Sequence, residues 1–297
     1  MPRYRDIAEE VLARIAAGDL PAGTALPSVR AAAAELGATP ATVGRAYAEL
    51  ARLGVLDSAP RRAARVARDG AMHARRALHG GRRLRLAGSD DPLLDRIAGV
   101  ADRVGARGSL GGLGALWQGR ADAAVLHLRH RDGRYNAPFA AGILAGRRPL
   151  LIHLWRREQG IMLAPGNPLG IAGVPDLERC TVALRGTGTG TRVLLDRLLR
   201  EAGTDPAGVR GPEVPTHLEA ALSVAAGLAD AAIGLRAAAA TAGLDFVPLA
   251  WEPFQLALPE DALGAATDLL AALEGAPPLP GFDLGGAGSV TALSPAR

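Results

Sequence analysis

A loop that alternates glycine with threonine between two arginines is the part of this sequence best suited to bind an anion. It reads Arg185-Gly-Thr-Gly-Thr-Gly-Thr-Arg192 and separates an expected strand from an expected helix. Alternating glycines let backbone amides converge, and the helix N-terminus adds partial positive charge. The two arginines can close over the anion; a flexible turn with one functional arginine is the plainer interpretation. The candidate contacts here are Arg185, Thr189, Gly190, Thr191 and Arg192.

Two serines earlier in the chain offer hydroxyl groups to the same anion. Ser89 precedes a helix that Asp91 caps and Pro92 begins, and Ser109 opens the next helix. Two hydroxyls and two helix N-termini facing the Thr/Arg loop form an oxyanion cage. Because a carboxylate inside such a cage repels an anion, we expect Asp90 to point outward.

Three more polar residues complete the candidate ligand site. Tyr135 and Asn136 supply a phenol and an amide at the hinge, with packing as the alternative for Tyr135. His217 precedes an Ala-rich helix and is either a histidine satisfied between lobes or a ligand group. No His, Cys and Asp cluster has metal-site spacing, and no nucleophile with its base is evident. The sequence therefore predicts no metal, no organic cofactor and no enzyme activity.

Short strands that alternate with helices from Leu84 onward predict an α/β domain. The strand at 84–89 is followed by the sequence Pro-Leu-Leu-Asp-Arg, and the strand at 181–184 is followed by the similar sequence Arg-Val-Leu-Leu-Asp-Arg. Residues 119–128 are likewise similar to residues 227–235. Chance similarity in an Ala-rich chain is the alternative. We expect two α/β lobes with the ligand between them, and a strand containing Met162 that crosses from one to the other.

The first seventy residues carry a different pattern. Apolar residues at helical spacing end at Gly18, Ser28 can cap a second helix, and Thr39 with Pro40 begins a third that runs to about Leu53. Val55-Leu56 and Arg65-Val66-Ala67 follow as two short strands around a Pro-Arg-Arg tip. Three helices, a tight Gly turn and a hairpin describe a winged helix-turn-helix.

The third helix is the expected DNA-reading element. Its N-terminal residues would lie nearest the bases, where Thr42 and Arg45 share one face and Val43 belongs to the core-facing stripe. Arginine can hold a guanine edge with two hydrogen bonds, whereas Thr and backbone amides serve phosphates. A solvated helix surface is the alternative for Arg45.

The run LPSVRAAAAELGATPATVGRAYAELARLGVL closely resembles the DNA-binding domain of GntR-type regulators, over roughly residues 3–68. The resemblance implies phosphate contacts from Arg30 and base contacts around Thr42 and Arg45. The wing usually has a Gly-x-Gly tip, but this chain has Ala-Pro-Arg-Arg-Ala at 59–63, so arginine side chains would replace the glycine-backbone contact. The expected DNA contacts are Arg30, Thr39, Thr42, Arg45, Arg61 and Arg62.

The second part of the chain resembles the type II periplasmic-binding-protein-like domain of predicted molybdate-binding regulators and of some molybdopterin-biosynthesis proteins. The matching pieces span about residues 84–258 and include Gly88-Ser89, GSLGGLGAL at 108–116, Tyr135-Asn136, Gln159-Gly160 and the Arg185–Arg192 loop. The resemblance implies a molybdate or tungstate effector. Where that family usually has a histidine after the first serine, this chain has Asp90, which leaves room for another oxyanion or a small organic acid.

Composition places these domains in a soluble, globular chain of 297 residues. All 34 basic residues are arginine, and nine of them lie between Arg61 and Arg85 against one acid, Asp69. A single cysteine suits a reducing cytosol, and neither a secretory signal nor a membrane-spanning run is visible. We therefore expect a cytoplasmic protein with a winged helix-turn-helix at 1–68, a linker at 69–83 and a two-lobed ligand-sensing domain at 84–297.

Together these features predict a ligand-responsive transcription regulator. Because one helix-turn-helix reads only a short half-site, we expect a homodimer that binds an inverted-repeat operator in double-stranded DNA. The same architecture with a small organic acid as effector is one alternative. A non-DNA anion-binding protein of molybdopterin metabolism is another, although it leaves the helix-turn-helix unexplained.

Overall fold

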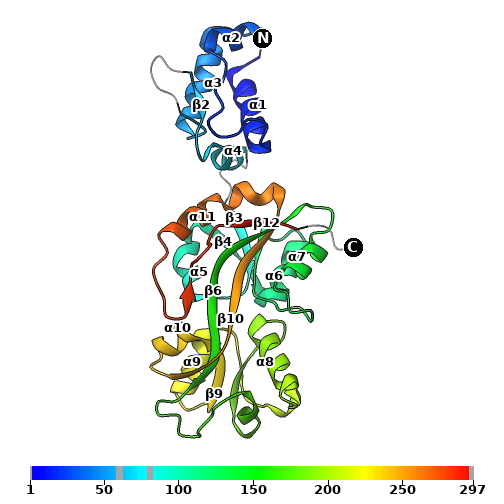
Figure 1. Ribbon diagram of the computed structural model, residues 1–297, viewed down its shortest axis with the longest axis vertical. Coiled ribbons are helices and arrows are strands. Elements are labelled where there is room, and N and C mark those ends of the chain that lie inside the picture. The colour runs from blue at the N-terminus through cyan, green and yellow to red at the C-terminus, as the bar shows by residue number, and fades with distance from the viewer. Residues whose placement is uncertain (1, 58–62, 79–82, 294–297) are drawn as a thin grey trace. The chain divides into compact units, whose positions relative to one another are not determined.

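The computed structural model describes residues 2–57, 63–78 and 83–293 (Figure 1). It divides into two compact units, one of residues 1–83 with 261–268 and the other of residues 84–260 with 269–297. Within the described residues, no helix is both long enough and apolar enough to cross a membrane.

Unit 1 is a small helical domain with a two-stranded hairpin. Its elements are α1 (Tyr4–Ala17), α2 (Val29–Glu35), α3 (Pro40–Arg52), β1 (Leu56–Asp57), β2 (Arg65–Val66) and α4 (Gly70–Leu78). β1 and β2 pair antiparallel, as the wing of a winged helix-turn-helix does. The core is aliphatic, with Ile15, Val43 and Leu50 fully buried.

The helix boundaries of unit 1 follow the caps that the sequence predicts. Gly18 ends α1 in the left-handed conformation, at φ 90°. Ser28 Oγ accepts a hydrogen bond from Ala31 N at the start of α2, and Thr39 Oγ1 accepts one from Thr42 N before Pro40 begins α3. The order of these caps positions the second and third helices of the helix-turn-helix.

Helix α4 lies within the segment expected to be a linker, residues 69–83. It packs against α1 and buries Gly70 and Ala74, four residues apart on one face. A Cβ at Gly70 would lie 2.6 Å from the Val55 carbonyl oxygen, so only glycine permits this approach. The sequence gives little sign of the helix, because its core-facing residues are small rather than large and apolar.

Unit 2 is an α/β domain built on a sheet with the strand order β4-β3-β5-β10-β6-β9-β7-β8. The first lobe holds β3 (Leu84–Gly88), α5 (Pro92–Ile97), β4 (Ala101–Arg107), α6 (Gly108–Trp117), β5 (Ala123–Leu126) and α7 (Ala137–Ile143). The second lobe holds β7 (Val182–Arg185), α8 (Gly190–Glu201), β8 (Glu213–Val214), α9 (His217–Ala225), β9 (Ala231–Leu235) and α10 (Arg236–Thr241).

Two long antiparallel strands run through both lobes, β6 (Pro149–Leu163) and β10 (Asp245–Pro259), drawn green and orange in Figure 1. β10 pairs with β5 in the first lobe, and β6 pairs with β9 in the second. The register between β6 and β10 shifts at Phe254/Gln255 and at Pro248/Ala250. The expected crossing strand through Met162 is therefore confirmed as β6, and β10 crosses between the lobes beside it.

The remaining elements are short segments within the two lobes and the elements that follow β10. They are α11 (Thr267–Glu274), β11 (Phe282–Asp283), β12 (Val290–Ala292) and the short 3-10 segments at Ala98–Val100, Val174–Arg179, Pro206–Gly208 and Glu260–Ala266. β11 and β12 both pair antiparallel with β6.

The internal repeat seen in the sequence corresponds to the two lobes. β3 lies between parallel neighbours β4 and β5, and β7 lies between parallel neighbours β8 and β9. In each lobe the central strand leads through a loop toward a helix, and the carboxyl ends of such parallel strands are where α/β sheets bind ligands. The repeat thus places the Ser89 and Arg185 loops in equivalent positions of the two lobes.

Candidate functional site

The expected DNA contacts of unit 1 lie on the N-terminal part of α3 and on α2. Thr39 and Thr42 join through their hydroxyl oxygens, 2.8 Å apart, so Thr39 is both the helix cap and part of this surface. Arg45 is exposed, and its guanidinium lies 4.0 Å above the centre of the Tyr4 ring. Arg30, on α2, is also exposed. Arg61 and Arg62 lie outside the described residues.

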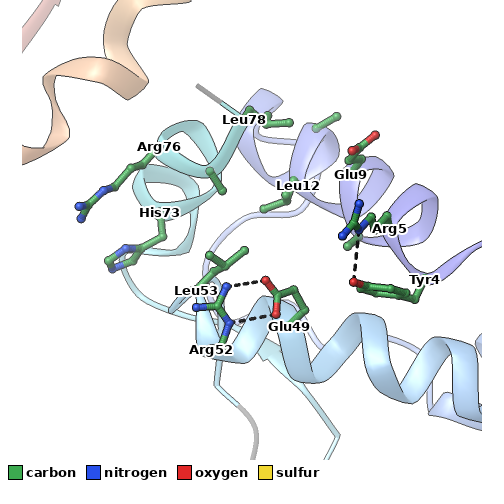
Figure 2. Close-up of a pocket in the computed structure, with 13 residues that line it drawn as sticks. Tyr4, Arg5, Glu9, Leu12, Glu49, Arg52, Leu53, His73, Arg76 and Leu78 are labelled. Carbon is green, nitrogen blue, oxygen red and sulfur yellow. Dashed lines mark hydrogen bonds and ion pairs between the residues drawn. The ribbon is translucent and has the colours of Figure 1, made fainter. Parts of the chain in front are cut away.

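A cavity of about 960 Å³ lies in unit 1 between α1, the C-terminal part of α3, and α4 (Figure 2). Four of its polar side chains are paired with each other: Arg52 forms an ion pair with Glu49, and Arg5 donates to the Tyr4 hydroxyl. None of the residues expected to bind a ligand or DNA lines it.

The two lobes of unit 2 touch along the Gly/Thr loop. Leu110 N, on α6, donates to the carbonyl oxygen of Gly188, with 3.2 Å between them. A Cβ at Gly108 would lie 2.9 Å from Thr189 Cα, and one at Gly190 would overlap the His127 ring. Glycine at these positions allows the backbones of the two lobes to approach, so the structure is that of a closed pair of lobes.

Ser89 and Ser109 meet on the first lobe, as the cage predicts. Their Oγ atoms are 2.8 Å apart, and Ser109 Oγ also accepts a hydrogen bond from the backbone N–H of His127. Both side chains are buried. The sequence places Ser89 just before one helix and Ser109 at the start of the next, and the strands that precede them, β3 and β4, are parallel neighbours.

Asp90 joins the lobes, which corrects the expectation that it points outward. Its Oδ1 accepts a hydrogen bond from Arg185 Nη2 at 2.5 Å, and its Oδ2 accepts one from His217 N at 3.0 Å. Arg185 ends β7 and His217 begins α9, so Asp90 bonds to a guanidinium and a helix N-terminus of the other lobe. Opposite charge across the lobes accounts for its direction.

Arg157, on β6, is a site residue that the sequence did not predict. It is fully buried; Nη1 donates to Asp91 Oδ2 at 2.6 Å and to the Asp90 carbonyl oxygen at 3.3 Å. Asp91 meanwhile caps α5, accepting from Leu93 N and Leu94 N. One carboxylate thus fixes both the first helix of the lobe and a guanidinium of the hinge.

Nitrogen atoms without hydrogen-bond partners gather around Asp90. Among the described residues, buried side-chain nitrogens that have none include Arg157 Nε and Nη2, Arg185 Nε and Nη1, and His217 Nδ1. All three residues are at least nine-tenths buried, and each bonds to Asp90. A buried donor without a partner costs about 1–3 kcal/mol, and more when it is charged. Their concentration at one place indicates a binding site for hydrogen-bond acceptors.

Gln159 and Glu252 continue the buried polar layer on the two hinge strands. Gln159 Nε2 lies 3.1 Å from Thr191 Oγ1, on the second lobe, and 3.0 Å from Glu252 Oε2. Glu252 Oε2 is also 3.0 Å from His127 Nδ1, and its Oε1 accepts from the Tyr135 hydroxyl at 3.3 Å. The expected hinge position of Tyr135 thus corresponds to a contact with β10.

The other expected ligand residues have separate partners. Asn136 bonds to Leu128 N through Oδ1 and to Gln255 Oε1 through Nδ2, which ties the turn before α7 to β10. Arg192 forms an ion pair with Asp196 on its own helix. Thr189 caps α8 by accepting from Arg192 N. The structure therefore brings Arg185, Thr191, His217 and the two serines to the lobe contact, and turns Asn136 and Arg192 toward other partners.

Burial sets the protonation of the site. Together with the positive charge of Arg157, it lowers the pKa of His127 to about 4. Burial likewise lowers the pKa of His217 well below its ordinary value, so both imidazoles are neutral at pH 7. Burial, together with the neighbouring Glu252 carboxylate, raises the pKa of Tyr135 to about 12.

Arg157, Glu252 and His127 belong to the buried polar layer of the candidate site and were not among the ligand residues expected from the sequence. Arg157 lies in the polar run Arg-Arg-Glu-Gln within an otherwise apolar strand, a pattern that equally fits an exposed strand segment. Glu252 lies within the equivalent strand near the end of the domain. The signal that could have found them is the position of these polar residues. Each lies in the middle of a long, otherwise apolar strand, which is where such a strand crosses from one lobe to the other.

Comparison with known families matches each unit to a different one. Residues 93–273 match the family described as PBP superfamily domain, and residues 3–66 match bacterial regulatory proteins, gntR family. The chain is 40% identical over 155 residues to the uncharacterized protein YvgK of Bacillus subtilis (strain 168), a match that covers 50% of either chain. The chain therefore spans about half the length of that curated relative.

Solved structures similar to the chain include three of different kinds. The tungstate ABC transporter structure from Geobacter sulfurreducens is 16% identical, with 65% of this chain and 97% of that chain covered and a TM-score of 0.49. The effector binding domain of QuiR in complex with shikimate is 12% identical, covering 65% and 98%, with a TM-score of 0.46. A GntR family transcriptional regulator from Listeria monocytogenes is 26% identical, covering 27% and 73%, with a TM-score of 0.25. We infer no ligand from these likenesses.

Proposed function

The chain belongs to the PBP superfamily through residues 93–273 and carries a gntR-type winged helix at its N-terminus, and from this premise we propose that it is a ligand-responsive transcription regulator. Unit 1 binds double-stranded operator DNA, and unit 2 binds a small anion between its lobes. The protein acts in the cytoplasm as a homodimer on an inverted repeat, because two-fold proteins match two-fold DNA.

The observation that carries the ligand half of the proposal is the group of unpartnered nitrogens on Arg157, Arg185 and His217. Guanidinium groups pair with planar carboxylates and with tetrahedral oxyanions through two parallel hydrogen bonds. The effector is therefore a small oxyanion or carboxylate. Molybdate and tungstate, implied by the sequence resemblance, and small organic acids are the first ligands to test.

Sensing rather than catalysis fits the groups at this site. A hydrolytic serine needs its Oγ on the ring of a neighbouring base, whereas Ser109 Oγ accepts from the backbone N–H of His127. The His127 ring nitrogen Nδ1 contacts Glu252 Oε2, and the contact printed between His127 and Ser109 runs through the backbone N–H rather than through the imidazole. The polar layer is therefore arranged for recognition.

The DNA half of the proposal is tested by comparing two arginines of unit 1. Arg45→Ala should weaken operator binding by about 1–3 kcal/mol and random DNA much less, because a bidentate base contact carries sequence information. Arg30→Ala should weaken both DNAs alike, since a phosphate contact does not. Fluorescence titrations of the full chain at two salt concentrations measure both effects. An affinity for DNA that is absent, or independent of salt, overturns the assignment.

A further inference from the structure

Three carboxyl groups and two guanidinium groups meet at the lobe contact. Arg157 and Arg185 lie among Asp90, Asp91 and Glu252, and all of these except Asp90 are buried. Both arginines are already paired with a carboxylate, and the imidazoles of His127 and His217 are neutral. An anion with acceptors alone would satisfy the free nitrogens but would place further negative charge beside the Asp90 carboxylate.

Asp90 has acceptor capacity left at the place where the donors are free. An ionised carboxylate offers about four lone-pair sites, and in this structure Arg185 Nη2 and His217 N occupy one on each oxygen. About a quarter of its side chain, 26%, stays exposed, unlike the fully buried Asp91. The site therefore presents unpartnered donors and an available acceptor side by side.

The Asp90 carboxyl stays ionised in this setting. Burial by itself raises its pKa, but the interactions with His217 and Arg185 outweigh burial and hold the pKa well below its ordinary value. Because it does not take up a proton at neutral pH, Asp90 can accept a hydrogen bond from a ligand but cannot donate one.

We infer that Asp90 selects the effector: the site takes a small anion that also carries a hydrogen-bond donor next to its charge. Protonated oxyanions and α-hydroxy or α-amino carboxylates share this chemistry. The anionic oxygens accept from Arg157 and Arg185, and the remaining O–H or N–H donates to Asp90. Fully deprotonated tetrahedral dianions such as sulfate, molybdate and tungstate place bare oxygens against the carboxylate and are rejected. This inference rests on the proposed anion site between the lobes.

Two matched pairs of ligands test the inference on the full chain by calorimetry. Hydrogenphosphate and sulfate have the same size and charge and differ by one proton, and glycolate differs from acetate by one hydroxyl group. The parent protein should prefer the donor-bearing member of at least one pair by roughly 100-fold, because an unmet buried acceptor penalises the analogue that lacks the donor. Which pair shows the preference distinguishes an inorganic from an organic effector.

Asp90→Asn should reduce that preference to less than about 10-fold and should raise the affinity for sulfate and molybdate, because the amide supplies a donor and removes a charge. Asp95→Asn, at an exposed carboxylate of α5, is the matched control and should keep the parent preference. Thermal unfolding of both variants establishes that they are folded.

The outcomes separate the inference from the proposed function. If anions bind the parent but neither pair shows a preference for its donor-bearing member, or if Asp90→Asn leaves the preference unchanged, the selection by Asp90 is wrong while the anion site stands. If Arg185→Gln binds every anion as the parent does, the site itself is misplaced and both fail. If none of the anions binds the parent or Asp90→Asn, both fail as well.

Discussion

Arg157 illustrates how a single buried charge can organise a hinge. Its guanidinium is fully buried, bonds to Asp91 and lies 4.3 Å from the centre of the Phe254 ring on the neighbouring strand. Trp155 stacks on the same ring, with 5.3 Å between the centroids. The desolvation cost of the guanidinium is met by a carboxylate and an aromatic face, so removal of either charge leaves the other uncompensated.

We expect Arg157→Met to lower the free energy of unfolding of unit 2 by about 3–5 kcal/mol, because Asp91 then remains buried without its cationic partner. The double variant Asp91→Asn with Arg157→Met should recover part of this loss, since an asparagine can still cap α5. The three tryptophans, Trp117, Trp155 and Trp251, all belong to unit 2, so urea titration followed by their fluorescence reports this unit within the full chain. Arg156→Met, at the exposed neighbour, is the control. A double variant less stable than Arg157→Met contradicts the argument.

The two buried histidines predict a pH dependence of stability. The folded-state pKa of His127 is about 4, below the ordinary 6.5, and that of His217 is lowered in the same direction. Below pH 6.5 the unfolded chain therefore binds protons that the folded chain excludes. The free energy of unfolding then falls by about 1.4 kcal/mol per pH unit down to about pH 4 because of His127, and His217 contributes a decrease of the same sign. Above pH 6.5 this contribution to the slope disappears.

His127→Gln should remove the contribution of one histidine to the slope of the unfolding free energy against pH. The substitution leaves Arg157, Glu252 and Asp90 around the position unchanged. Urea titrations between pH 4.5 and 7.5, followed by tryptophan fluorescence, measure it, and His130→Gln at a half-exposed histidine is the matched control. An unchanged slope in His127→Gln shows that the imidazole is charged in the folded protein.

Which site residues the sequence could predict depended on local signals. Ser89, Ser109 and Arg185 stand beside helix starts and strand ends, so their proximity follows from α/β topology. Arg157 and Glu252 lie inside strands, and their burial depends on partners far along the chain, 66 residues away in the pairing of Arg157 with Asp91. No periodic pattern encodes such a pairing. The same limit explains Asp90, whose direction is set by Arg185, 95 residues away.

At the scale of elements, the helix caps were predictable and the packing of small residues was not. The boundaries of α1, α2 and α3 follow from Gly18, Ser28 and Thr39 with Pro40, each of which acts within four residues. Helix α4 buries Gly70 and Ala74, so its core-facing side carries small residues in place of the large apolar ones that mark α1 and α3. Elements that are stabilised by close approach of two backbones are therefore the hardest to predict from a sequence.

The start of α8 provides a test of lobe closure. Because a Cβ at Gly190 would overlap the His127 ring, Gly190→Ala should hold the lobes apart and weaken anion binding by at least about 10-fold. Gly142→Ala, on α7 where a Cβ meets nothing within 4 Å, is the matched control and should bind as the parent does. Calorimetry gives the affinities, and small-angle scattering of both variants reports the opening. A Gly190→Ala protein that binds anion at parental affinity means that closure does not involve this contact.

On the scale of the whole chain, the repeat in unit 2 explains how one ligand can contact both lobes at once. Each lobe contributes a parallel strand trio and a helix N-terminus, and β6 with β10 forms the connection through which both are joined. A ligand that bonds to Asp90 and Arg157 on one side and to Arg185 on the other favours the closed arrangement. It shifts the equilibrium only by the difference between its affinities for the closed and open forms.

Coupling between anion and operator DNA is the prediction that involves both units. If the anion changes operator affinity by some factor, operator DNA must change anion affinity by the same factor, within the 5–150-fold range usual for coupled sites. We expect Arg185→Gln to bind operator as the parent does without anion, because Arg30, Thr42 and Arg45 belong to unit 1, yet to lose the response to the anion. Added salt also weakens protein–DNA contacts, so the variant in the same anion solution corrects for ionic strength. Equal responses of parent and variant would assign the whole effect to screening by salt. If the anion changed operator affinity but operator DNA did not change anion affinity, linkage between the two sites would be excluded.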